Sequence, residues 1–186
     1  MLLSEDGDME VIGVVRPSNM TMEHYPFMEV LSQAGLPNNV LWSQTRNGPH
    51  YKFDFSDLAN DKLQIFKSPD LGTRIQIGRY TQKGPFATVV YLVLVCPESR
   101  GVFLVLEKTE EIQPTPILLA SSIAQLADLI DAFISFRRSL TTLKSKEDPK
   151  PIWERFENAC REIDHEGFKH DFSFFGNMIA EYLANG

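Results

Sequence analysis

Hydrophobic and polar residues alternate with a period of two along the middle of the chain, which predicts β-strands. Residues 51–55 (YKFDF) alternate clearly, and residues 63–66 and 74–80 are shorter examples of the same pattern. Residues 87–95 (ATVVYLVLV) form a continuous apolar run rich in β-branched side chains, which predicts a central strand covered on both faces. A turn sequence, CPESRG, leads to a further strand at residues 101–108. The short connections without helices predict an antiparallel meander.

The last third of the chain has helical periodicity instead. Ser122 is a good N-cap, and Gln125 three residues later completes the pattern of a capping box. Two neighbouring apolar stripes follow over residues 123–140, so we expect the sheet and another helix to cover this helix. A charged, proline-containing loop at residues 144–151 precedes two more predicted helices. Their apolar positions are Ile152, Trp153, Phe156, Ala159, Cys160 and Ile163 in the first, and Phe175, Met178, Ile179, Tyr182 and Leu183 in the second.

Residues 117–136 (ILLASSIAQLADLIDAFISF) raise the question of a membrane helix, because a span needs about 20 mostly apolar residues. The stretch contains Asp128 and Asp131, and acidic side chains are costly in the middle of a bilayer. We therefore interpret this stretch as part of the buried core, and no membrane association is expected.

The N-terminal region has a weaker pattern. Residues 10–16 predict a short peripheral strand, residues 23–34 predict a helix that ends at Gly35-Leu36-Pro37, and residues 1–9 are expected to be a flexible N-terminus. The whole pattern predicts a single α+β domain over residues 1–186. It has one mainly antiparallel β-sheet, helices packed around that sheet and a helical C-terminal third. Six side chains are expected to be nearly inaccessible in its core: Val90, Leu92, Leu94, Phe103, Leu126 and Ile130.

Composition narrows the classes of function. Hydrophobic residues make up 43% of the 186 positions and charged residues 23%, which is typical of a globular protein. The net charge of −7 argues against a general nucleic-acid binder and permits a basic protein partner, although many cytosolic proteins are equally acidic. The first ten residues lack the basic residues of a signal or transit peptide. Cys96 and Cys160 are predicted to be buried thiols in a reducing compartment, so we expect a cytoplasmic protein.

Few residues indicate chemistry. His165 and His170 are five positions apart, which does not place both on one helix face as metal ligands. No phosphate-binding loop, nucleophile elbow, zinc-protease or dinucleotide-binding motif is present in the sequence. We therefore expect no enzymatic activity, no metal and no cofactor.

Three acidic residues are the candidate partner-binding site. Glu107, Glu110 and Glu111 follow the strand at 101–108, where they are either an acidic rim that attracts a basic partner or a solvated loop. Trp42 and Trp153 are candidate interface anchors, although Trp153 also fits a core position beside Ile152 and Phe156.

The order of these motifs resembles a known family. A helix ending in "GLP", a strand pair "VVYLVLVCPESRGVFLVL", the step "ILLASSIAQLADLIDAF" and the closing "WERFENACREIDHEGFKHDFSFFGNMIAEYL" follow one another. This order is similar to the SUKH superfamily, specifically to its fourth subfamily, whose bacterial members are immunity proteins of polymorphic toxin systems. The resemblance covers residues 27–184. Two departures are Ala120, where the family often has Asn, and Phe175-Gly176, where a Trp is common.

The resemblance implies a non-catalytic binder. Such a protein neutralises a cognate toxin, of nuclease or nucleic-acid deaminase type, by stoichiometric binding over the active site or another essential surface. A toxin that binds nucleic acid is expected to be basic, which suits the net charge of −7. Two alternatives are a SUKH-type interaction scaffold or secretion chaperone, and a hydrolase that uses carboxylates outside any recognised pattern.

Overall fold

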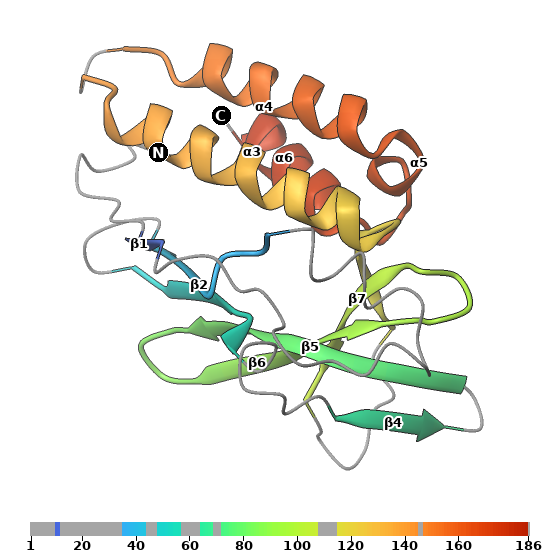
Figure 1. Ribbon diagram of the computed structural model, residues 1–186. Helices are drawn as coiled ribbons and strands as arrows, with labels where there is room; N and C mark the ends of the chain where they lie inside the picture. The colour runs from blue at the N-terminus through green and yellow to red at the C-terminus, as the bar shows by residue number, and fades with distance from the viewer. Residues whose placement is uncertain are drawn as a thin grey trace.

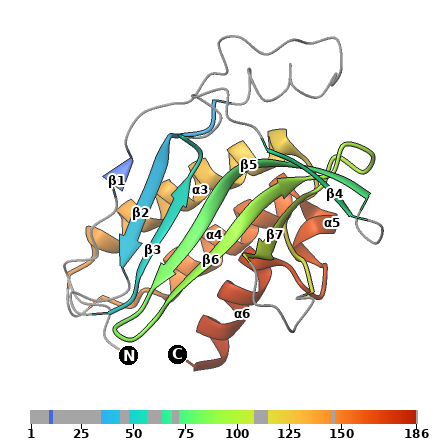
Figure 2. The same cartoon turned by 90° about the horizontal axis from the view of Figure 1, so that it is seen from below.

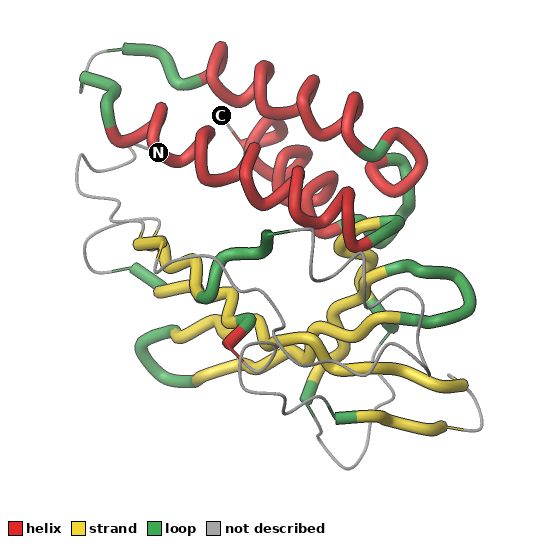
Figure 3. The backbone as a smooth tube through the Cα atoms, viewed as in Figure 1, coloured by secondary structure: helices red, strands yellow, loops and turns green. Residues whose placement is uncertain are grey.

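The computed structural model describes residues 10–11, 35–43, 48–56, 64–68, 72–107, 115–144 and 147–185 (Figure 1). In this part of the chain the strands form one sheet and the long helices form a layer on one side of it. Figure 3 shows the same division along the backbone, with the strands in one layer and the long helices in the other. The α+β fold class predicted from the sequence is confirmed.

Eight strands of the described residues form the sheet, and every pairing between them is antiparallel. Neighbours follow the order β1-β2-β3-β5-β6-β7-β8, while β4 pairs with β5 outside this path. The predicted meander is therefore present from β5 to β8. The strand bounds are β1 Glu10–Val11, β2 Asn39–Ser43, β3 His50–Asp54, β4 Ile65–Ser68, β5 Gly72–Lys83, β6 Thr88–Val95, β7 Val102–Leu106 and β8 Ile117–Ala120.

Four helices follow the sheet in the chain. Their bounds are α3 Ile123–Thr141, α4 Lys150–Ile163, α5 His165–Phe168 and α6 Phe174–Asn185. The backbone N–H of Gln125 donates to Ser122 Oγ at 3.2 Å, which confirms the predicted N-cap of α3. The predicted helix at residues 23–34 lies outside the described residues, as do residues 12–16 of the first predicted strand and the N-terminus at 1–9.

The described helices cover one face of the sheet, and the prediction that β6 is covered on both faces holds only at its end, where residues 93–95 are buried on both sides. Figure 2 looks onto the opposite, outer face, and no described helix lies over it. Cross-strand register places Val93 beside Leu104 on the inner face, where both are buried, and Leu92 beside Val105 on the outer face. The predicted burial is confirmed for Leu94, Leu126 and Ile130 and is wrong for Val90, Leu92 and Phe103, which are partly exposed.

Aromatic rings fill the space between the sheet and the helices. The ring of Trp42 on β2 lies 4.9 Å from that of Phe133 on α3 and stacks on Tyr51 of β3 at 5.4 Å. Trp153 on α4 stacks on Tyr182 of α6 at 4.0 Å. Only 6% of Trp42 and 7% of Trp153 is exposed, so both are core residues and neither is an interface anchor.

Candidate functional site

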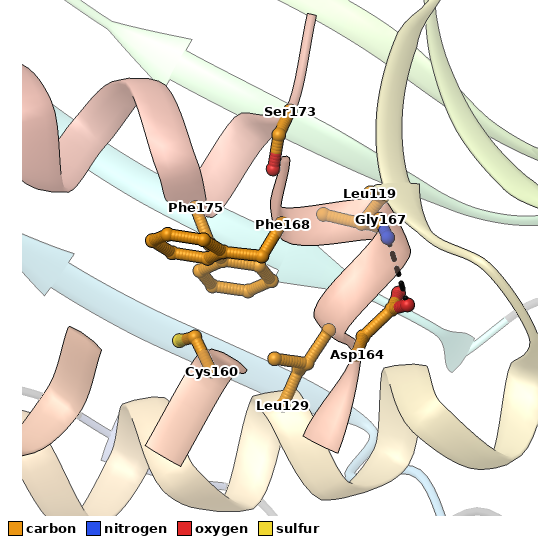
Figure 4. Close-up of a pocket in the computed structure, with 8 residues that line it drawn as sticks. All are labelled: Leu119, Leu129, Cys160, Asp164, Gly167, Phe168, Ser173 and Phe175. Atoms are coloured by element: carbon orange, nitrogen blue, oxygen red, sulfur yellow. Dashed lines mark hydrogen bonds between the residues drawn. The ribbon is translucent and has the colours of Figure 1, made fainter. Parts of the chain in front are cut away.

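A polar junction joins the start of α3 to the end of α4. Asp164 is 2% exposed, and its carboxylate accepts hydrogen bonds from the backbone N–H of Ser121 at 2.7 Å and of Gly167 at 3.0 Å. The second bond caps the short helix α5 (Figure 4). Gln125 Nε2 donates to the carbonyl of Ile163 at 3.1 Å. These bonds satisfy backbone groups at two helix ends, so the junction is structural.

A small cavity lies behind this junction. Its lining residues converge from β8, α3, α4, α5 and α6 (Figure 4): Leu119, Leu129, Cys160, Asp164, Gly167, Phe168, Ser173 and Phe175. Its volume of about 10 Å³ is about the space of one water molecule. Burial, and secondarily the nearby Glu157, raises the pKa of the Cys160 thiol to about 12. A thiol with so high a pKa is not a nucleophile at neutral pH, so Cys160 is not a candidate nucleophile in this cavity.

The described part of the chain contains no group of three or more His, Cys, Asp or Glu side chains able to hold a metal ion. His165 and His170 are both exposed, on α5 and just after it. None of the described helices is long and apolar enough to cross a membrane. The features that remain are on the surface.

The outer face of the sheet is apolar along β6 and β7. Val90 and Leu92 on β6 and Phe103 and Val105 on β7 point outward and are partly exposed, while Leu94 between them is buried. Figure 2 shows these two strands side by side on the face away from the helices. This partly exposed apolar band is a candidate surface for protein interaction.

Charged side chains occupy the same face along β3 and β5. Lys52 Nζ lies 2.6 Å from Asp54 Oδ2. Burial opposes ionisation of Asp54, but hydrogen bonds from Lys52 and Ser56 outweigh it and hold the pKa of Asp54 below its usual value. Arg79 and Lys83 on β5 are exposed, and neither forms an ion pair with a described residue.

The β5–β6 hairpin carries the most exposed large apolar side chain in the described part of the chain. Phe86 lies at its tip and is 99% exposed. The tip is closed by a hydrogen bond from the N–H of Gly84 to the carbonyl of Ala87 at 2.8 Å, so Phe86 belongs to a defined turn. An aromatic ring held in solvent by an ordered hairpin is suited to entering a pocket on another protein.

The predicted acidic site is only partly described. The backbone N–H of Glu107 extends the ladder by donating to the carbonyl of Val90 at 2.8 Å, and the exposed Glu107 side chain therefore follows Val105 on the outer face. Glu110 and Glu111 lie outside the described residues, so the acidic site of three glutamates stays a prediction.

Comparison with protein-family models, with curated proteins and with solved structures found no match for this chain. The class of the protein therefore comes from its own structure. It is an α+β protein in which an antiparallel sheet has one face covered by helices and one partly exposed face over which no described helix lies.

Several of these surface residues were missed by sequence reasoning. Phe86 was not predicted as a site residue, although an aromatic residue beside Gly84-Pro85 at the tip of a turn is a usable signal for an exposed anchor. Arg79 was also not predicted as a site residue. The pattern within its own strand does not show which side chains of the neighbouring strands lie beside it, and only the cross-strand register places Leu92 there.

Proposed function

We propose that this protein is a non-catalytic binding module that engages one protein partner through the outer sheet face and the β5–β6 hairpin. The observation that carries the proposal is the fully exposed Phe86 at the tip of an ordered hairpin, next to a partly exposed apolar sheet face. Burying such a side chain and face in a partner removes apolar area from water, which is the main driving force of association.

The particular function proposed is immunity in the cytoplasm against a cognate toxin of nuclease or nucleic-acid deaminase type. It is supported by the resemblance of residues 27–184 to the SUKH superfamily. Stoichiometric inhibition requires only a complementary surface, and the outer face with its hairpin is a surface of that kind. A scaffold or secretion chaperone would use the same surface without protecting the cell.

The test uses the product of the reading frame next to this gene. We expect that product to be toxic when expressed alone, to be neutralised by co-expression of this protein, and to form a 1:1 complex with it. Phe86→Ala should weaken binding at least about tenfold, because truncation of a buried aromatic anchor removes a central contact. The midpoint of thermal unfolding should not change, since Phe86 makes little contact within the protein.

Phe172→Ala is the matched control, because Phe172 is a second exposed phenylalanine, 49% exposed, on the segment before α6. Its effect on binding should be small. Protection at far less than one equivalent of protein would show turnover and overturn the inhibitor proposal. Binding without toxicity of the neighbouring product would favour the scaffold or chaperone.

A further inference from the structure

We infer that the outer sheet face recognises an acidic protein surface, in which a carboxylate binds Arg79 beside apolar side chains that contact Leu92 and Val105. This inference rests on the proposed binding function and specifies the chemistry of the partner. It differs from the expectation of a basic partner, which follows from the net charge of −7 of the whole chain.

Arg79 is placed between the charged and the apolar halves of the outer face. Its cross-strand partners are Asp54 on β3 and Leu92 on β6, and Leu92 pairs in turn with Val105 on β7. The Asp54 carboxylate is already bound by Lys52 at 2.6 Å and by the N–H of Ser56 at 3.0 Å. Arg79 is therefore an exposed guanidinium that forms no ion pair within the described residues, with partly exposed apolar side chains on one side.

Two cations on this face form no ion pair within the described residues. Asp54 is paired with Lys52. Arg79 and the exposed Lys83 lie on β5, four residues apart on the same face. Glu107 is an acid on the far side of the apolar band, after β7. The described charges on the β5 side of the face are therefore net positive, in a chain that is negative overall.

Local charge, and not net charge, decides which partner surface fits at short range, because charges more than about 10 Å apart are largely screened at ordinary salt. A guanidinium presents a planar fork that matches a carboxylate with two hydrogen bonds, and arginine is enriched in the cores of protein interfaces. The pairing strengthens when flanking apolar contacts exclude water, as Leu92 and Val105 would do here.

A nucleic acid could also supply anions, but the outer face favours a protein. Nucleic-acid binding requires several cations along a stripe to neutralise successive phosphates. Here an apolar band of Val90, Leu92, Phe103 and Val105 occupies the place where that stripe would continue. Phosphate backbones offer little apolar surface to such a band, whereas a protein surface offers carboxylates and apolar side chains together.

The experiment uses the full chain labelled with ¹⁵N and maps backbone chemical-shift changes on adding four probes. The probes are a short peptide alternating Glu and Leu, an all-Glu peptide of equal length, a peptide alternating Lys and Leu, and a single-stranded oligonucleotide. We expect the Glu–Leu peptide to shift the amides of β5, β6 and β7 most strongly, the all-Glu peptide less, and the Lys–Leu peptide and the oligonucleotide little.

Arg79→Glu should weaken binding of the Glu–Leu peptide about tenfold, which is the effect of losing roughly one charge-assisted hydrogen bond. Arg155→Glu is the matched control, since Arg155 is also exposed but lies on α4 in the helical layer. Arg79→Lys should retain part of the affinity. No shift on this face, equal binding of the Lys–Leu peptide, stronger binding of the oligonucleotide, or an equal effect of Arg155→Glu would overturn the inference.

The two proposals fail separately. If Phe86→Ala abolishes binding of the neighbouring gene product while the protein binds acidic and basic peptides equally, the proposed binding function stands and the inference of an acidic partner surface is wrong. If the peptides show the preference and no neighbouring product is inhibited, the charge selectivity of the face stands and immunity is wrong.

Discussion

At the scale of single residues, Asp164 connects the α4–α5 junction to the start of α3, which lies 43 residues earlier in the chain. Its carboxylate binds the N–H of Ser121 at the start of α3 and the N–H of Gly167 in α5, while its own backbone N–H donates to Cys160 at the end of α4. Gly167 is required beside it, because a Cβ at that position would collide with the carboxylate of Asp164. The close approach therefore depends on both residues.

Asp164→Asn should destabilise the protein by about 1–3 kcal/mol, because an amide cannot accept from both N–H donors and one buried donor loses its partner. Urea unfolding measures the change as a lower midpoint with an unchanged slope. Asp128→Asn is the matched control, on an exposed position of α3, and should change stability by less than about 0.5 kcal/mol. An equal effect of the two substitutions would contradict this role for Asp164.

At the scale of elements, the long β5 strand contains an irregularity between Gln76 and Gly78, where its register with β6 shifts. Gly78 lies against β3 at this point. A Cβ there would collide with the backbone oxygen of Asp54 and would lie 2.8 Å from a ring carbon of Phe55. The bulge therefore brings two backbones closer together than a side chain at position 78 permits.

Gly78→Ala should lower the free energy of unfolding by about 1–3 kcal/mol, since the new methyl group forces backbone movement in a packed region. Gly84→Ala is the matched control in the hairpin turn, where a Cβ would lie 3.4 Å from the carbonyl oxygen of Ala87. Thermal unfolding of the two variants measures the difference. Similar midpoints would show that β3 and β5 can separate at no cost.

The elements also show how far the sequence predicts the fold. The period of two at 51–55 and the capping pattern at Ser122 predicted β3 and the start of α3, because both signals are local. The strands β2 and β8 were missed: β8, Ile117–Ala120, is a four-residue apolar run that is indistinguishable by periodicity from the helix following it. The continuous apolar run of β6 predicted cover on both faces, which holds only for residues 93–95 at the end of the strand. The partly exposed outer face, and with it the candidate site, became visible only through the pairing of strands.

At the scale of the whole molecule, the buried thiol of Cys160 reports on the integrity of the helical layer. Cys160 is enclosed between α4 and its neighbours, and burial raises its pKa to about 12. Both the lack of access and the protonated state prevent alkylation in the native protein. Exposure of this thiol therefore requires the helices to separate.

In a Cys96→Ala variant, iodoacetamide should leave Cys160 unmodified under native conditions and modify it across the same urea range in which the protein unfolds. Mass spectrometry at each urea concentration measures the modified fraction. The wild type is the control and has a second buried thiol at Cys96. Rapid modification of Cys160 without denaturant would show that the layer opens locally.

The segment before α6 also affects how this protein can meet copies of itself. The N–H of Leu118 on β8 donates to the carbonyl of Phe172 at 2.8 Å. Leu118 also forms a parallel β-bridge with Ser173. The β8 edge of the sheet thus already has part of its free hydrogen-bonding capacity occupied by the protein's own chain. Unpaired edge strands act as templates for strand addition and aggregation. Growth of the sheet across β8 would first have to displace the Phe172–Ser173 segment, so the segment that leads into α6 also restricts self-association by strand addition.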